Sequence, residues 1–417
     1  MGSHHIVQAP ADTSFQAPKS AVMGAIGALV VGSALLAYGI ISAPWRGWSN
    51  MLLASHYATG VALGAGVIMA LYYVTNAGWW PVIKRITEAM TTYLPIGLLT
   101  FLVIGVFGMH DLYEWSHPNI VANDHLLQHK SALLNPTSFY IITFVVFLGW
   151  IGFTMAMRAQ SLKQDADGKD DRTTTCVRLG ALFLVFYGLS VTFSSLEWLM
   201  SLEPHWFSTM FGVYQFIGMF VAAASTLTLF VLGMKRAGYL GYVSKVHLHD
   251  LGKMMFAFST FWAYIWVSQY LLIWYSNIPE ETGYFIARNQ GGWMVLFLLN
   301  PMLNWAIPFL TLLPVKNKQN PKVLFIVACT LIVGHWLDLY LQVMPATSHF
   351  AAHHANADVH GPFFGLTEIG AMASLGGLFV LVVLKMLEKA PLLPKNDPYL
   401  EESLNFESGP GPQGFQG

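Results

Sequence analysis

Ten apolar runs, each long enough to cross a membrane as a helix, constrain this chain most strongly. A helix needs about 20 mostly apolar residues to cross the hydrocarbon core. Only 10% of the 417 residues are charged, against about 25% in ordinary soluble domains. The sequence therefore predicts an all-α polytopic membrane protein with ten transmembrane helices. The runs lie near residues 21–41, 51–75, 90–109, 138–157, 179–200, 208–233, 254–276, 292–313, 323–344 and 365–386.

One further segment, WWPVIKRITE (79–88), is partly apolar but too short and too charged to span. Its composition predicts a helix lying in the membrane interface.

The basic residues predict the orientation. Of the 21 Lys and Arg residues, 18 fall in the N-terminal arm, the even-numbered loops and the C-terminal tail. The remaining loops hold only Arg46, Lys130 and Arg288. Loops rich in Lys and Arg stay in the cytoplasm, so we expect a multi-pass membrane protein with both termini cytoplasmic. The net charge of −1 gives no reason to expect a nucleic-acid partner.

A weak internal repeat predicts the arrangement of the helices. FSSLEWLMSLEP (193–204) aligns with GHWLDLYLQVMP (334–345), and HDLYEW (110–115) aligns with QYLLIW (269–274). Both alignments are offset by four helices, which predicts two four-helix bundles, spans 2–5 and 6–9, flanked by spans 1 and 10. The chain then divides into an N-terminal arm (1–20), the first span and loop (21–50), a first bundle (51–207), a second bundle (208–345), an outer loop with the tenth span (346–390) and a C-terminal tail (391–417).

Polar residues inside the apolar runs indicate where function lies. The stretch VGHWLDLYLQVMP (333–345) places an acid and a histidine on one helical face, three residues apart. An ionisable group in a bilayer costs roughly 2.5–3.5 kcal/mol, so such groups are candidates for function. The candidates for a quinol or proton site are His335, Asp338, Glu197, His56, Asp111, His110, Gln269 and Glu368. The candidates for a proton path are Asn300 and Asn304, beside the helix-breaking Pro301 and Pro308, together with Lys253 and Tyr187.

Three interpretations of these groups stay open. They form a quinol pocket and proton path that opens outward, in which His335 and Asp338 accept the protons that a quinol releases. Alternatively, His56 and His335 are axial ligands of a b-type haem. In the third interpretation the groups satisfy one another as interhelical hydrogen bonds. We predict no metal site, because the outer histidines His353, His354 and His360 have no supporting carboxylate or cysteine cluster, and no tightly bound cofactor.

Three stretches carry a resemblance to a known family: FSTFWAYIWVSQYLLIWYSNIPEETGYF (258–285), FSSLEWLMSLEPHWFSTMFG (193–212) and DPYLEESLNFES (397–408). With its ten spans and paired bundles, the chain resembles the NrfD/PsrC-type integral membrane subunits. Within them it is most similar to the F subunits of alternative complex III, a bacterial quinol:cytochrome c oxidoreductase. The likeness covers nearly the whole chain.

The resemblance implies a place in a respiratory complex that oxidises menaquinol. Its iron–sulfur clusters and haems would lie on partner subunits, so that this chain holds no redox centre. The implied partners are a homologous NrfD-like membrane subunit, periplasmic iron–sulfur and multihaem cytochrome c subunits, a terminal oxidase, quinone and lipid. Glu197, His335 and Asp338 match the polar helix positions of the family. The alternatives are a structural anchor with a proton path but no quinone site of its own, and, less favoured, a secondary transporter.

Overall fold

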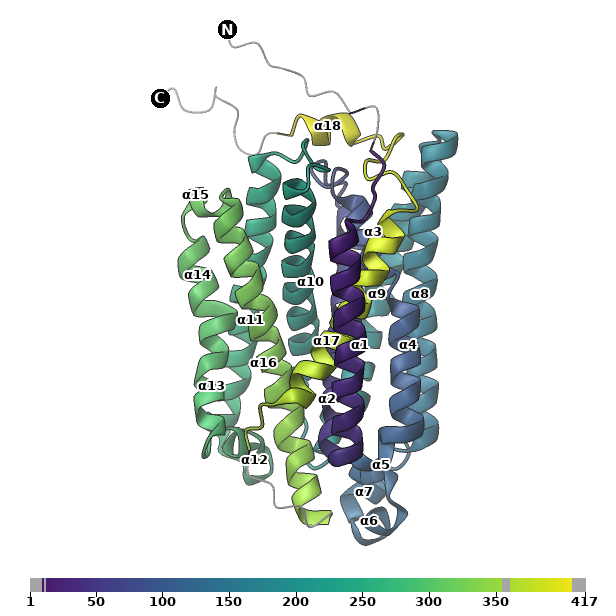
Figure 1. Ribbon diagram of the computed structural model, residues 1–417. Helices are drawn as coiled ribbons and strands as arrows, with labels where there is room; N and C mark the ends of the chain where they lie inside the picture. Colours follow the sequence, from purple (N-terminus) through teal and green to yellow (C-terminus); the bar gives the residue numbers. More distant parts are fainter. Residues whose placement is uncertain (1–9, 11–12, 355–360, 407–417) are drawn as a thin grey trace.

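The computed structural model describes residues 10, 13–354 and 361–406, and the described chain is helical without strands. Ten of its helical segments are long and apolar enough to cross a membrane, as predicted. They run side by side along one direction (Figure 1). The spans are α1 (Lys19–Ser42), α2 (Pro44–Val74), Lys84–Leu112, α8 (Pro136–Asp167), α9 with its last turn (Asp171–Leu202), α10 (Phe211–Arg236), α11 (Lys245–Ser276), Trp293–Leu312, α16 (Pro321–His354) and α17 (Leu366–Leu387).

Two of these spans contain a π-helical segment. The third span consists of α3 (Lys84–Thr91), α4 (Leu94–Val103), π-helical Ile104–Gly108 and α5 (Met109–Leu112). The eighth consists of α13 (Trp293–Pro301), π-helical Met302–Ala306 and α14 (Ile307–Leu312). The short helices between spans are α6 (Pro118–Asn123), α7 (His125–Lys130), α12 (Pro279–Arg288) and α15 (Val315–Lys318), and α18 (Leu400–Leu404) lies in the C-terminal segment.

The prediction of an interfacial helix at 79–88 is wrong. The chain turns before Lys84, where α3 begins, and every residue of α3 is buried within the protein. Lys84 and Arg85 are neutralised there by Asp397 and Asp165. Arg85 also pairs with Glu88 of the same segment, but Asp397 and Asp165 come from distant parts of the sequence, so the local sequence could not reveal these two pairs.

Glycines bring α1 and α17 into close contact. A side chain on Gly32 would overlap the backbone at Ser374, and one on Gly370 would overlap Leu35. The hydroxyls of Ser33 and Ser374 are 2.7 Å apart and hydrogen-bonded. Small residues allow such close backbone approach, which drives helix association in lipid.

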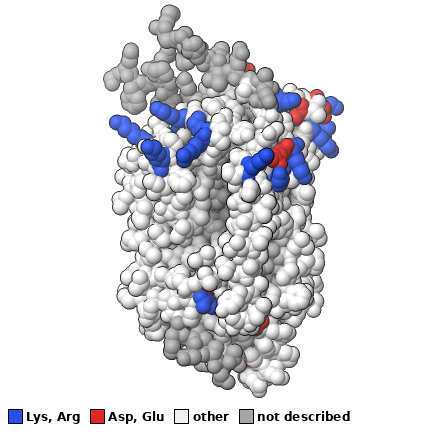
Figure 2. All heavy atoms as spheres, in the orientation of Figure 1, with Lys and Arg blue, Asp and Glu red and all other residues white. Residues whose placement is uncertain are grey.

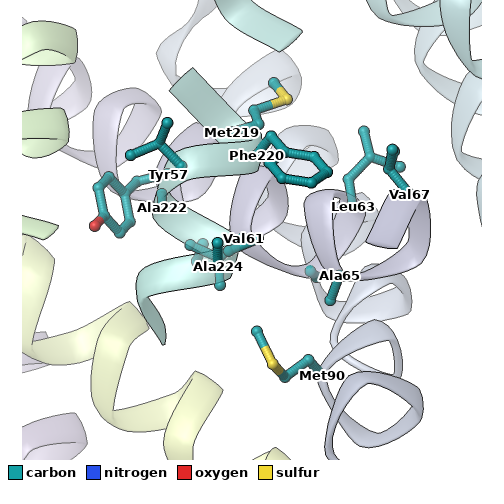
Figure 3. Packing of buried hydrophobic residues seen from close by; sticks show 14 of the residues in the cluster. Tyr57, Val61, Leu63, Ala65, Val67, Met90, Met219, Phe220, Ala222 and Ala224 are labelled. Atoms are coloured by element: carbon teal, nitrogen blue, oxygen red, sulfur yellow. The ribbon is translucent and has the colours of Figure 1, made fainter. Parts of the chain in front are cut away.

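The second span, α2, is the central helix of the fold. It contacts α1, α3, α4, α9, α10, α16 and α17. Gly60 and Gly64 face Met219 and Ala223 of α10, and the surrounding side chains interlock between the two helices (Figure 3). This contact crosses the predicted boundary between the two bundles and is as intimate as the contacts within them. The division into two bundles therefore stays a prediction.

Basic residues gather at one end of the molecule, where α1 begins and α18 lies (Figures 1 and 2). Both ends of the described chain meet there. The backbone N–H of Leu392 donates to the Thr13 carbonyl at 2.9 Å, and the Ser403 hydroxyl donates to the Trp79 carbonyl at 2.9 Å. We call this the basic end and the opposite one the outer end.

The glycine contact between α1 and α17 can be tested with two substitutions in one helix. Replacing Gly32 by Leu forces the helices apart, and overpacking of this kind costs about 1–3 kcal/mol. Replacing Gly27 by Leu adds the same side chain where nothing lies within 4 Å. We expect a lower thermal unfolding midpoint in detergent for Gly32→Leu only. Equal midpoints for the two variants would show that α1 is not held by this contact.

Candidate functional site

Asp338, on α16, is the centre of a buried hydrogen-bond network. Only 2% of the residue is exposed. Its carboxylate accepts hydrogen bonds from the Tyr214 hydroxyl, the Asn300 amide at 2.8 Å, the Trp262 indole at 3.3 Å and the Gln342 amide at 3.2 Å. These donors come from α10, α13, α11 and α16 itself. A buried carboxylate is tolerated where such donors replace water. Asp338 therefore connects four helices through hydrogen bonds.

Amide side chains extend the network on both sides of Asp338. The Gln215 amide donates to Gln342, and His56 Nε2 lies 3.2 Å from the Gln215 side-chain oxygen. On the other side, the Asn304 amide donates to the Asn300 side-chain oxygen at 2.7 Å. The result is one hydrogen-bonded chain from α2 to the eighth span, through His56, Gln215, Gln342, Asp338, Asn300 and Asn304.

His335 lies beside this network without joining it. Its Nδ1 is 4.0 Å from Asp338 Oδ2, too far for a hydrogen bond, and has no partner within the described chain. The ring packs at 5.4 Å from the ring of Tyr57. It occupies space that only a glycine leaves, since a side chain on Gly218 would overlap it. The predicted His335–Asp338 pair is thus brought together as neighbours rather than as a bonded pair.

A small cavity opens beside Asp338. Its volume is about 20 Å³, and Gln269, Tyr214 and Arg288 contribute to its lining. That space holds about one water molecule; the ring of a quinol is far larger. Gln269, predicted from its depth in the seventh span, therefore does face the network.

Arg288 replaces a backbone hydrogen bond that is missing from α16 next to the network. Pro345 has no N–H, so the carbonyl four residues earlier, on Leu341, loses its helical donor. Arg288 Nε donates to that carbonyl at 2.7 Å, and another of its nitrogens donates to the Gln342 carbonyl at 3.0 Å. Glu203 accepts from the same guanidinium at 2.6 Å. One buried arginine from the loop between the seventh and eighth spans thereby fixes the α16 backbone at Gln342.

Glu197 is the buried acid that corresponds to Asp338 in the predicted repeat. It is fully buried on α9, and neither carboxyl oxygen has a hydrogen-bond partner in the described residues. The nearby Tyr113 hydroxyl donates instead to the Trp198 carbonyl at 2.9 Å. The structure therefore leaves Glu197 outside the network, as an isolated polar group whose burial has no structural compensation.

Glu368 and the pair His110–Asp111 also lie outside the network. Glu368 accepts two hydrogen bonds from Arg46, at 2.8 and 2.7 Å, and so joins α17 to α2. His110 bonds to Ser116 at 3.0 Å, and its carbonyl accepts from a neighbouring histidine. No described hydrogen bond links Asp111 to the network.

The remaining predicted residues are not brought together with Asp338. Lys253 pairs with Asp250 at the basic end of α11. Tyr187 is buried on α9, its hydroxyl has no partner in the described chain, and it lines a separate cavity of about 270 Å³. Among the described residues, no group of three or more His, Cys, Asp or Glu is placed to hold a metal. His360 and the side chains of His353 and His354 lie outside the described part.

The contacts of the two membrane histidines favour hydrogen bonding over haem ligation. His56 Nε2 is taken by Gln215, and the ring of His56 meets Trp198 edge-on at 6.3 Å. His335 is enclosed by Tyr57 and Gly218. The nitrogen of His56 that a haem iron would need is thus occupied, and His335 is packed against protein groups.

Sequence reasoning missed three members of the network: Tyr214, Gln215 and Trp262. Gln215 had a detectable signal, since an amide in the middle of an apolar run needs a partner. Tyr214 lies near the start of its span, where aromatic residues usually belong to the interfacial belts, and Trp262 lies among other aromatic residues of the apolar run FSTFWAYIW, so neither gave a signal. Only the helix packing shows that these two point inward.

The outer loops are ordered against one another. His205, after the fifth span, lies 2.6 Å from Asp124 in the loop after the third. Partial burial alone would raise the pKa of Asp124, but hydrogen bonds from Leu127 N–H and His205 hold that pKa below its usual range. Lys130 donates to the Pro204 carbonyl beside this pair. The outer loops are therefore connected to one another and form a continuous surface at the outer end.

No family model and no curated protein sequence matches this chain.

The role of Arg288 can be tested by comparing two arginines. We expect Arg288→Gln to lower stability by about 3–5 kcal/mol, as when one partner of a buried ion pair is removed. The control, Arg172→Gln, removes a pair with Asp167 in which both side chains are about 30% exposed, and such pairs are worth at most about 1 kcal/mol. Thermal unfolding in detergent measures both. A small effect of Arg288→Gln would mean that α16 tolerates the break at Pro345 unaided.

Proposed function

We propose that the chain is a proton-conducting membrane subunit of a respiratory quinol:cytochrome c oxidoreductase. The observation that carries the proposal is the continuous polar network around Asp338, buried in helices that are long and apolar enough to cross a membrane. Ionisable residues within membrane spans are costly, and those that persist typically mark ion or proton paths. The network has an acid, Asp338, at its centre with His335 beside it, and His56 at one end, and these are groups that exchange protons.

The water-sized cavity supplies the next step of the path. It opens beside Asp338 and Gln269, next to Arg288 of α12, and Figure 1 places α12 at the outer end. Water there would exchange a proton with the Asp338 carboxyl group. His335, 4.0 Å from that carboxylate, would pass the proton on by a small movement of its ring.

The eighth span has an irregular backbone at this point. Pro301 and Pro308 cannot donate helical hydrogen bonds, and the chain between them is π-helical at Met302–Ala306. Segments of this kind occur often at functional sites. Freed carbonyls beside Asn300 and Asn304 would bind water along the path.

The distribution of charge supports an outward-facing path. The basic end carries most of the Lys and Arg residues (Figure 2), and such ends face the cytoplasm. On this orientation both termini are cytoplasmic in a bacterial inner membrane, and the cavity beside Asp338 opens toward the periplasm.

The proposal that this chain belongs to a complex rests on its resemblance to the NrfD/PsrC-type membrane subunits. It supplies the partners: an NrfD-like membrane subunit, periplasmic iron–sulfur and multihaem cytochrome c subunits, and a terminal oxidase. Menaquinol would be oxidised by the assembly, with the clusters and haems on the partner subunits. The ordered outer loops, joined through His205 and Asp124, offer a surface on which periplasmic subunits would dock.

Direct contact between quinol and this chain is the second candidate. His335 and Asp338 are the type of pair that accepts quinol protons, and they lie close together. The cavity beside them has room for about one water molecule, which favours proton conduction over quinol binding at this position.

Asp338→Asn tests the proposal in the assembled complex reconstituted into vesicles. Because Asn cannot carry a proton, we expect the rate of proton translocation to fall by about 100-fold, the usual scale for losing a proton-transfer group. The control is Asp171→Asn, an exposed residue in the first turn of α9. A pH-sensitive dye and the rate of cytochrome c reduction are recorded together, with haem content confirming assembly.

The outcomes separate the candidate functions. Proton translocation that is unchanged in Asp338→Asn would contradict the proposal. A raised KM for menaquinol with an unchanged proton-to-electron ratio would instead identify Asp338 as part of a quinol site.

A further inference from the structure

A large apolar cavity lies between α1, α2, α10, α16 and α17, away from the Asp338 network. Its volume is about 490 Å³, within the range of small-molecule sites. Only two of the lining residues, Tyr57 and Thr226, have polar side chains. On the face shown in Figure 2, the surface is hollowed below the basic end.

The cavity has the depth of one membrane leaflet. Along α10 its lining runs from Thr226 to Ala237, which is roughly 16 Å at 1.5 Å per residue. That is about half of a hydrocarbon core of about 30 Å. The cavity therefore extends from the basic end to about the middle of the membrane, and Ala54 and Tyr57 of α2 line its deep part.

The deep end offers a polar head group only the side-chain hydroxyl of Thr226. The Tyr57 hydroxyl already donates to the Ile332 carbonyl at 3.0 Å. A quinone ring needs hydrogen-bond partners to be held in place, whereas a hydrocarbon chain needs none. The lining therefore favours a purely apolar occupant.

The open end is basic. Pro18 and Ala237 both line the cavity, and their sequence neighbours Lys19 and Arg236 are exposed. No carboxylate of the described chain pairs with either of these two cations. Basic pockets between membrane helices at the cytoplasmic side attract anionic lipid head groups.

We propose that this cavity binds one acyl chain of an anionic phospholipid, with its phosphate held at Lys19 and Arg236. The lipid would fill the space between the α1–α17 pair and α10, which the protein itself leaves open. The bound lipid would thus be a structural component of the fold. This site does not depend on the proton path at Asp338, because no residue is shared between them.

Two glycines allow the cavity to be filled by substitution. Gly233 of α10 and Gly376 of α17 both line it, and nothing lies within 4 Å of a side chain added at either position. The double variant Gly233→Phe/Gly376→Phe fills the cavity without a clash at the point of attachment. Gly152→Phe, in the exposed part of α8, adds the same side chain where space is also open and serves as the control.

Native mass spectrometry of the purified protein, after exchange into detergent with added phosphatidylglycerol, counts the lipids retained. We expect one retained phosphatidylglycerol in the parent and in Gly152→Phe, and none in the double phenylalanine variant. Lys19→Gln and Arg236→Gln should each reduce the preference for phosphatidylglycerol over phosphatidylcholine about fivefold, the usual effect of one basic residue near the membrane surface.

Three results would overturn the proposal. The first is equal phosphatidylglycerol retention by the double variant and the parent. The second is a head-group preference that neither charge substitution changes. The third is loss of co-purified menaquinone, rather than phospholipid, from the double variant, which would assign the cavity to a quinone tail.

Discussion

The burial of one carboxylate determines how the second half of the chain packs. Asp338 has no access to bulk water, so its negative charge is acceptable only where protein donors surround it. Those donors come from α10, α11 and α13 as well as from α16. Each helix must therefore present one specific side chain at one depth. In lipid, where no hydrophobic force pulls apolar helices together, such a shared acceptor also fixes their register.

Backbone defects next to Asp338 are part of the same arrangement. Pro345 removes a helical donor from α16, and Pro301 and Pro308 do so in the eighth span. At α16 the gap is closed by Arg288, whose guanidinium supplies several donors in a fixed plane. The eighth span responds differently, by widening into a π-helical segment beside Asn300 and Asn304. The first gap is therefore closed by a side chain, and the second is accommodated by a change of helix type.

Much of the fold follows from the sequence, because length and apolarity decide which segments cross a membrane. The ten spans are confirmed, while the interfacial helix at 79–88 is wrong, because the charges of Lys84 and Arg85 are cancelled by distant acids. At the site, Asp338, His56, Asn300 and Asn304 are brought into one network. The sequence could not identify Tyr214 and Trp262, because it does not show whether an aromatic side chain in an apolar run faces lipid or a buried acid. Glu368 is the opposite case. The sequence marks this buried acid as a candidate for function, but in the structure it pairs with Arg46 and joins two helices.

The contrast between Glu197 and Asp338 gives the predicted repeat a physical meaning. The aligned segments both carry a buried acid and end in a proline, Pro204 and Pro345. Asp338 has donors from four helices and a histidine 4.0 Å away. Glu197 has neither, and both its oxygens are unpartnered in the described chain. An uncompensated buried polar group costs stability without a packing benefit, so Glu197 is not explained by the packing of α9. The two halves of the chain therefore differ in their polar chemistry. Asp338 is held in a hydrogen-bond network, whereas Glu197 has no hydrogen-bond partner in the described chain.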